Sequence, residues 1–148
     1  ICCGGGGIPV TLEGHHLKGA SAVIEKDFAS CLLAKQLDAD MLIILTAVDQ
    51  VYINYNQPDQ RALSELTLKE ADAYIKSGQF AKGSMLPKVE ACMEFVRALP
   101  GRSAIITSLE KAAQALHGEA GTRIRSEPAP SSYVPLDMDS ESYEADIN

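Results

Sequence analysis

The stretch MLIILTAVDQVYINY, residues 41–55, places the strongest constraint on the fold. Residues 41–45 are all apolar and follow directly after Asp40. A short, unbroken apolar run is typical of a strand covered on both faces, as in a parallel sheet between helix layers. Open α/β sheets bind ligands just beyond the carboxyl ends of their strands, so we expect a ligand near residues 46–49. The alternative is a strand followed by a plain connector.

Helix-like and strand-like patterns alternate along the chain, which predicts an α/β domain. Thr67 and Glu70 have the spacing of a capping box, and Gly78 is suited to a left-handed helix stop. Ser84 and Ser108 are candidate N-caps, with Pro87 in the first turn after Ser84. Helices are predicted over residues 23–39, 67–77, 88–99 and 109–116, and strands over residues 41–45, 51–53, 102–107 and 120–124.

Four consecutive glycines, Gly4, Gly5, Gly6 and Gly7, lie near the start of the chain. Such a run does not form a stable helix or strand interior. It allows backbone amides to approach a ligand closely, above all an anion, and the alternative is a flexible loop. The surrounding residues match neither the G-x-x-x-x-G-K-[ST] phosphate loop nor a G-x-G-x-x-G helix start.

Two lysines lie where a helix dipole does not favour a cation. Lys26 and Asp27 are at the start of the first predicted helix, where the dipole stabilises the aspartate but not the lysine. Lys88 is in the first turn of the third predicted helix, where a bound anion would offset the unfavourable dipole. The alternative for Lys88 is a surface lysine whose stem lies along apolar side chains.

Charge is divided unevenly along the chain. Residues 1–125 hold 14 acids and 13 bases, whereas residues 126–148 hold six acids and no base. The nearly neutral body argues against nucleic-acid binding through bulk charge. The last segment, rich in serine and proline, is predicted to be an acidic disordered tail. No apolar run approaches the roughly 18 residues of a membrane span, so no membrane association is predicted.

Cysteine and histidine usage predicts no metal site. Cys2, Cys3, Cys31 and Cys92 form no C-x-x-C pair. Cys31 and Cys92 fall in apolar helical patterns, which favours buried thiols over disulfides and therefore a reducing, cytoplasmic compartment. Neighbouring His15 and His16 lack a third ligand, and residues 13–20 are interpreted as a surface turn or short hairpin.

Several segments together resemble one enzyme family. They are ICCGGGGIPV, VIEKDFASCLLAKQLDADMLIILTAVDQVYINYNQPDQRAL, QFAKGSMLPKVEA and AIITSLEKA followed by GEAGTRI. Their order and spacing over residues 1–125 are similar to the C-terminal half of carbamate kinases, in the amino-acid kinase superfamily. The resemblance implies a three-layer αβα sandwich with a mainly parallel open sheet, of which this is the nucleotide-binding half. It also implies reversible phosphoryl transfer between ATP and carbamate, use of Mg²⁺, a homodimer, and a role in arginine metabolism.

The resemblance assigns roles to particular residues. Lys26 and Lys88 resemble the lysines that neutralise the transferring phosphoryl group, and Asp27 resembles the aspartate that holds them in place. The four glycines fall in the segment near the carbamate and the transferred phosphate. The residues that match nucleotide-site segments are Thr46, Ala47, Val48, Asp49, Tyr52, Met85 and Pro87.

Two features separate this chain from the family pattern. The family motif usually reads GSMGPK, whereas here Leu86 stands in place of the second glycine, where a side chain is expected to hinder a close backbone approach to the nucleotide. The acidic tail after residue 125 also has no counterpart in the family pattern. Separately, the chain begins at Ile1 in what reads as the end of a strand, so we expect it to be part of a longer enzyme. The alternatives to a working kinase are an ATP- or ADP-binding half-enzyme without catalysis and an interaction protein that recruits partners through the tail.

Overall fold

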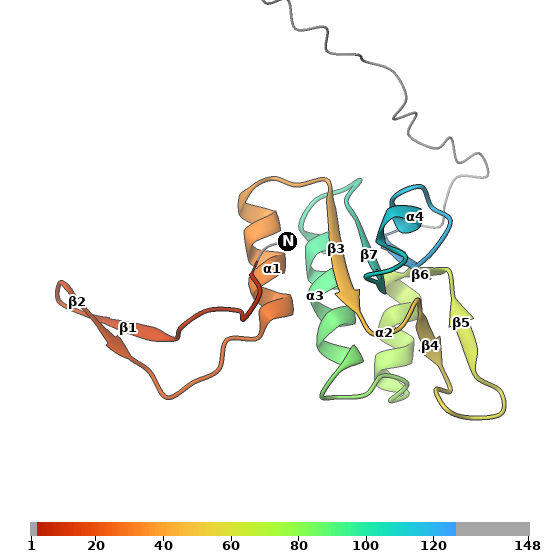
Figure 1. Cartoon of the computed structure of the whole chain (residues 1–148), viewed down its shortest axis with the longest axis horizontal. Helices are drawn as coiled ribbons and strands as arrows, with labels where there is room; N and C mark the ends of the chain where they lie inside the picture. The colour runs from red at the N-terminus through yellow and green to blue at the C-terminus, as the bar shows by residue number, and fades with distance from the viewer. Residues whose placement is uncertain (1–2, 127–148) are drawn as a thin grey trace, which may run out of the picture.

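The computed structural model describes residues 3–126, so the predicted tail lies outside the described residues except for Ser126. Figure 1 shows the described elements in three groups: a projecting hairpin, a central sheet with its helices, and a second small hairpin. In chain order they are β1 Val10–Glu13, β2 His16–Gly19, α1 Lys26–Gln36, β3 Met41–Thr46, β4 Val51–Ile53, β5 Arg61–Leu63, β6 Glu65–Thr67, α2 Leu68–Lys76, α3 Met85–Ala98, β7 Ser103–Ser108, α4 Ala112–Leu116 and β8 Thr122–Arg125.

The central sheet is an open, four-stranded sheet in the order β3-β7-β8-β6. β3 pairs in parallel with β7 from Met41 opposite Ser103 to Thr46 opposite Ser108. β6 pairs in parallel with β8, and β7 pairs with β8 in the antiparallel sense. The α/β class and the mainly parallel open sheet predicted from the sequence are therefore confirmed.

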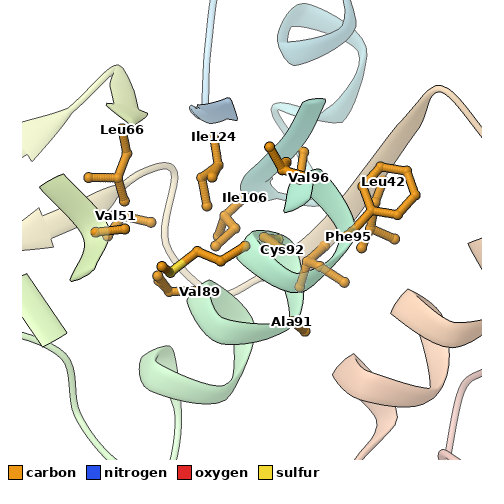
Figure 2. Packing of buried hydrophobic residues seen from close by; sticks show 14 of the residues in the cluster. Leu42, Val51, Leu66, Val89, Ala91, Cys92, Phe95, Val96, Ile106 and Ile124 are labelled. Atoms are coloured by element: carbon orange, nitrogen blue, oxygen red, sulfur yellow. The ribbon is translucent and has the colours of Figure 1, made fainter. Parts of the chain in front are cut away.

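The main core lies between this sheet and α3. Alternate residues of the strands face the helix, because successive side chains of a strand point to opposite faces. Figure 2 shows side chains of α3 packed against Leu42, Ile106 and Ile124 of three strands. The buried α3 residues are Val89, Ala91, Cys92, Met93, Phe95 and Val96. α1 packs against both α3 and β3, and α2 packs against α3 and β6, so the three helices share one face of the sheet.

The opposite face of β7 is covered by the loop that follows α4. Gly121 in this loop has φ +81°, and an added Cβ would lie 2.9 Å from Ile105 Cγ2 and 3.1 Å from Thr107 Cβ. The close approach of the loop to β7 therefore requires glycine.

The two hairpins lie outside the central sheet. β1 and β2 form an antiparallel hairpin over the segment predicted to be a surface turn or short hairpin, and Figure 1 shows it extending away from the sheet. β4 and β5 form a second antiparallel pair. β5 and β6 were not predicted, because each has three residues and too little apolar alternation to signal a strand.

Helix ends differ from the prediction in three places. α1 is shorter than residues 23–39, since Glu25 caps its start and Asp38 has φ +54° just after its end. α3 begins at Met85 instead of residue 88, and Ser84 occupies its N-cap position without a side-chain bond. Ser108 was wrongly predicted to cap a helix: it ends β7, and α4 has only five residues. The capping box at the start of α2 is confirmed.

Candidate functional site

Packing of α1 against α3 brings three of the predicted site residues together. Lys88 Nζ of α3 donates a hydrogen bond of 2.9 Å to Asp27 Oδ2 of α1. Lys26 Nζ lies 3.7 Å from the same oxygen of Asp27 and 3.6 Å from Glu25 Oε1. One carboxylate oxygen thus faces two ammonium groups.

The three side chains differ in their exposure to solvent. Asp27 is 3% exposed and Lys88 is 8% exposed, whereas the side chain of Lys26 is 50% exposed. A buried charge requires a partner, which explains why Lys88 tolerates its place in the first turns of α3. The partner is a carboxylate of the protein itself. Lys26 retains the exposure that an amine needs to reach a ligand.

The glycine segment lies against the start of α1. Gly6 has φ +88°, and an added Cβ would overlap the carbonyl oxygen of Ile24 and lie 3.2 Å from the backbone nitrogen of Lys26. Gly6 N also donates to Cys3 O at 2.8 Å. Glycine is therefore required at this position, and the segment runs beside the helix end that carries Lys26 and Asp27.

A cavity of about 220 Å³ lies beyond the carboxyl end of β3. Five of its lining residues were predicted from the sequence, and they are Thr46, Ala47, Val48, Tyr52 and Met85. The other five were missed, and they are Tyr55, Gln79, Phe80, Ala81 and Ser84. The rings of Tyr52 and Tyr55 have centroids 5.9 Å apart and are tilted by 50°. This aromatic lining suits a flat ring.

The cavity and the charged cluster lie at the same end of α3. Met85, at the start of α3, lines the cavity, and Lys88 is three residues further along the helix. Residues three apart in a helix lie on neighbouring parts of its surface. The first turn of α3 holds no acidic residue and its N-cap makes no side-chain bond, so the helix end favours an anion.

Some predicted residues are not in the cavity lining. Asp49 and Pro87 do not line it, and neither does the glycine segment. The backbone carbonyl of Asp49 instead accepts a bond of 3.3 Å from Thr107 Oγ1. Leu86 also lies outside the lining, and its side chain packs against the core cluster.

The residues missed in the cavity wall come from two places. Tyr55 belongs to the segment after β4 that the sequence marks as a break, and the others belong to the connection between α2 and α3. Phe80 and Ala81 lie within QFAKGSM, so their place in that motif was the available signal. Gln79 opens the same motif, but its hydrogen-bond partner Asn54 lies 25 residues away, and no local pattern indicates that contact.

The described residues do not form a protein-held magnesium site. Residues 3–126 contain no group of three or more His, Cys, Asp or Glu side chains that could hold a metal ion. Asp27, the carboxylate at the centre of the cluster, already contacts two ammonium groups through Oδ2. Mg²⁺ in phosphoryl-transfer sites is usually held by one or two carboxylates together with substrate phosphates and waters, so a bound nucleotide would supply part of its coordination.

The thiols near the cluster are unsuited to nucleophilic chemistry. Burial raises the pKa of the Cys92 thiol, and the negative charge of Asp27 raises it further. Burial also raises the pKa of Cys31. Both side chains are free and buried, as predicted from their apolar surroundings. They remain protonated at neutral pH and act as core residues.

The chain belongs to the amino acid kinase family, whose model matches residues 1–108. Its relatives include the carbamate kinase of Clostridium perfringens, 60% identical over 124 residues, which cover 84% of this chain and 40% of that enzyme. Carbamate kinase 2 of Enterococcus faecalis is 56% identical over 124 residues, covering 84% of this chain and 39% of the relative. The chain spans about 40% of the length of the relatives it matches.

Solved structures of carbamate kinases are also similar to this chain. The structure of Giardia lamblia carbamate kinase bound to AMP-PNP superposes with a TM-score of 0.77 and 52% identity, covering 82% of this chain and 38% of that one. A second structure of the Giardia enzyme gives a TM-score of 0.75 at 50% identity, covering 84% of this chain and 42% of that one. Within residues 3–126, no helix is long and apolar enough to cross a membrane.

Proposed function

We propose that this chain forms the nucleotide-binding part of a carbamate kinase. That enzyme transfers a phosphoryl group reversibly between ATP and carbamate, giving carbamoyl phosphate and ADP. The observation that carries the proposal is the pair of lysine amines on Asp27 Oδ2, at 2.9 Å and 3.7 Å, at the end of α3 that also lines the aromatic cavity. The names of the relatives support the choice of carbamate as the acceptor.

The proposed roles follow from what phosphoryl transfer requires. An oxygen of carbamate attacks the γ-phosphorus of ATP, a new P–O bond forms, and the bond from phosphorus to ADP breaks. Negative charge is spread over the phosphoryl oxygens, so catalysis depends on positioning and charge neutralisation. Lys88 and the more exposed Lys26 supply the neutralising charge, and Asp27 keeps the two amines from repelling each other apart.

The cavity would hold the base of the nucleotide. Tyr52 and Tyr55 offer ring faces, and Met85 supplies a polarisable thioether beside them. The start of α3 would then face the phosphates, between the base and the two amines. Gly6, beside the start of α1, keeps the backbone close to this charged end.

The second candidate is a half-enzyme that binds ATP or ADP without transferring phosphoryl. The observation that favours the half-enzyme is that the chain spans only about 40% of the length of its relatives. In this case the cavity and Lys88 bind the nucleotide, and carbamate has no complete site.

Two measurements on the purified chain separate the candidates. ADP binding is measured by calorimetry, and ATP formation from carbamoyl phosphate and ADP is followed by luciferase. If the chain both binds ADP and forms ATP, it is a kinase. If it binds ADP without forming ATP, it is the half-enzyme. Lys88→Ala should weaken ADP binding, whereas the control Lys35→Ala, which removes a surface ion pair with Glu94, should not. No ADP binding by the wild-type chain would refute both candidates.

The proposal includes a compartment, a pathway and an assembly. The free, buried thiols of Cys31 and Cys92 support the cytoplasm, where thiols stay reduced. Arginine breakdown and a homodimer follow from the family resemblance. Sedimentation of the purified chain tests the dimer.

A further inference from the structure

One hydrogen bond joins the two walls of the aromatic cavity. Gln79, in the connection between α2 and α3, accepts a bond of 2.8 Å at Oε1 from the backbone nitrogen of Asn54. A backbone N–H can only donate, so this bond fixes which end of the Gln79 amide faces Asn54. Gln79 also lines the cavity, so the bond lies at the cavity wall.

Asn54 lies in the turn that carries Tyr52 and Tyr55, the two tyrosines of the cavity wall. It follows the last residue of β4 and has φ +52°, so the chain changes direction there. Tyr52 lies two residues before it and Tyr55 one residue after it, and both line the cavity. The backbone position of Asn54 therefore sets where the two rings lie.

The opposite wall is anchored in the core. Phe80, next to Gln79, is 5% exposed and meets Tyr74 of α2 edge-to-face, with ring centroids 6.3 Å apart. The wall continues through Ala81 to Met85 at the start of α3. The backbone of Gln79 is thus held beside the buried Phe80, and its side-chain amide bonds to Asn54 in the turn that carries the tyrosines.

We propose that Gln79 is a positioning residue that sets the width of the cavity and thereby the affinity for the base of a bound nucleotide. This inference rests on the proposed function, because it assigns the base to the cavity and the phosphates to the lysines. The inference predicts different effects on the base and on the phosphates of the nucleotide. Loss of the hydrogen bond between Gln79 and Asn54 should weaken binding of the base and leave binding of the phosphates unchanged.

The test compares two substitutions at Gln79 with one matched control. Gln79→Met keeps the length of the side chain and removes the acceptor, whereas Gln79→Glu keeps an acceptor for Asn54 N. Gln60 offers the control, because its Oε1 accepts an equivalent bond of 2.8 Å from Asn56 N within the same turn and does not line the cavity. For the chain and each variant, calorimetry measures binding of ADP and of inorganic pyrophosphate, and hydrogen exchange measures the protection of the Asn54 amide.

The expected result is specific to the base. Gln79→Met should raise the Kd for ADP about five- to tenfold, the equivalent of one net hydrogen bond, and leave the Kd for pyrophosphate unchanged. It should also speed exchange of the Asn54 amide. Gln79→Glu should restore ADP binding to within about twofold of the wild type, and Gln60→Met should bind ADP as the wild type does.

Other results would overturn the inference. Unchanged ADP binding or unchanged Asn54 exchange in Gln79→Met would remove the positioning role while leaving the proposed function standing. An equal loss of ADP and pyrophosphate binding, or the same loss in Gln60→Met, would indicate a general effect on stability. A wild-type chain that binds no ADP would refute the proposed function, and the inference would fall with it.

Discussion

The buried ion pair between Asp27 and Lys88 should make the two residues strongly interdependent for stability. Both are almost fully buried, and their charged atoms are 2.9 Å apart. Removing one member of such a pair leaves an uncompensated buried charge and costs about 3–5 kcal/mol, whereas replacing both with apolar side chains is often nearly neutral. We therefore expect Asp27→Leu and Lys88→Met each to lose about 3–5 kcal/mol of unfolding free energy, which is a large share of the usual 5–15 kcal/mol.

The double variant Asp27→Leu/Lys88→Met is the informative one. It should be more stable than either single variant, because no unpaired charge remains. The control is Lys35→Met, which breaks an ion pair of 2.7 Å whose carboxylate side chain on Glu94 is 52% exposed. A surface pair of this kind is worth at most about 1 kcal/mol.

The unfolding free energies of all four variants are measured by urea unfolding. Far-ultraviolet circular dichroism is the probe, because the chain contains no tryptophan for fluorescence. Two results would contradict the reasoning. One is a double variant as unstable as the sum of the two single losses. The other is an Asp27→Leu variant within about 1 kcal/mol of the wild type, which would mean that the pair is not buried in solution.

Three further predictions follow from the same geometry. Asp27→Ala should abolish ATP formation from carbamoyl phosphate and ADP while calorimetry finds ADP affinity within a few-fold of the wild type; unchanged turnover would refute its role. Gly6→Ala should lower the urea midpoint, because φ is +88° and the new Cβ would overlap the carbonyl of Ile24; an unchanged midpoint would contradict the close packing. Bonds from Thr67 lower the pKa of Glu70, so its stabilisation is complete above the unfolded value of about 4.3 and is lost as pH falls through the folded pKa. Glu70→Gln should therefore cost about 0.5 kcal/mol at pH 7 and nothing near pH 2, and a cost independent of pH would argue against the charged cap.

Features encoded by neighbouring residues were predictable from the sequence. The capping box of Thr67 and Glu70, the apolar strand β3 and the apolar face of α3 each depend on residues within a few positions of one another. Thr46 was predicted as a ligand residue from its place at the carboxyl end of β3, where open α/β sheets bind ligands. Met85, at the start of α3, was predicted only through the family resemblance.

Features that join distant parts of the chain were not predictable in the same way. Asp27 and Lys88 are 61 residues apart, and Gln79 and Asn54 are 25 apart. The observed ends of α1 and α3 differ from the predicted ends. Ser108 ends a strand instead of capping a helix, because β7 pairs with β3 along its full length. Such pairings depend on how the elements pack, and side-chain spacing along the chain carries no record of them.

The sequence by itself determined the class of fold, the main strand and helices, and the residue types available for neutralising an anion, because hydrophobic periodicity and capping act over a few residues. Only the tertiary structure decided that two lysines share one oxygen of a buried aspartate and that Gln79 joins the walls of the cavity. The physical reason is that burial and distance, which set the strength of a charge pair or a hydrogen bond, exist only once α1, α3 and the sheet have packed together.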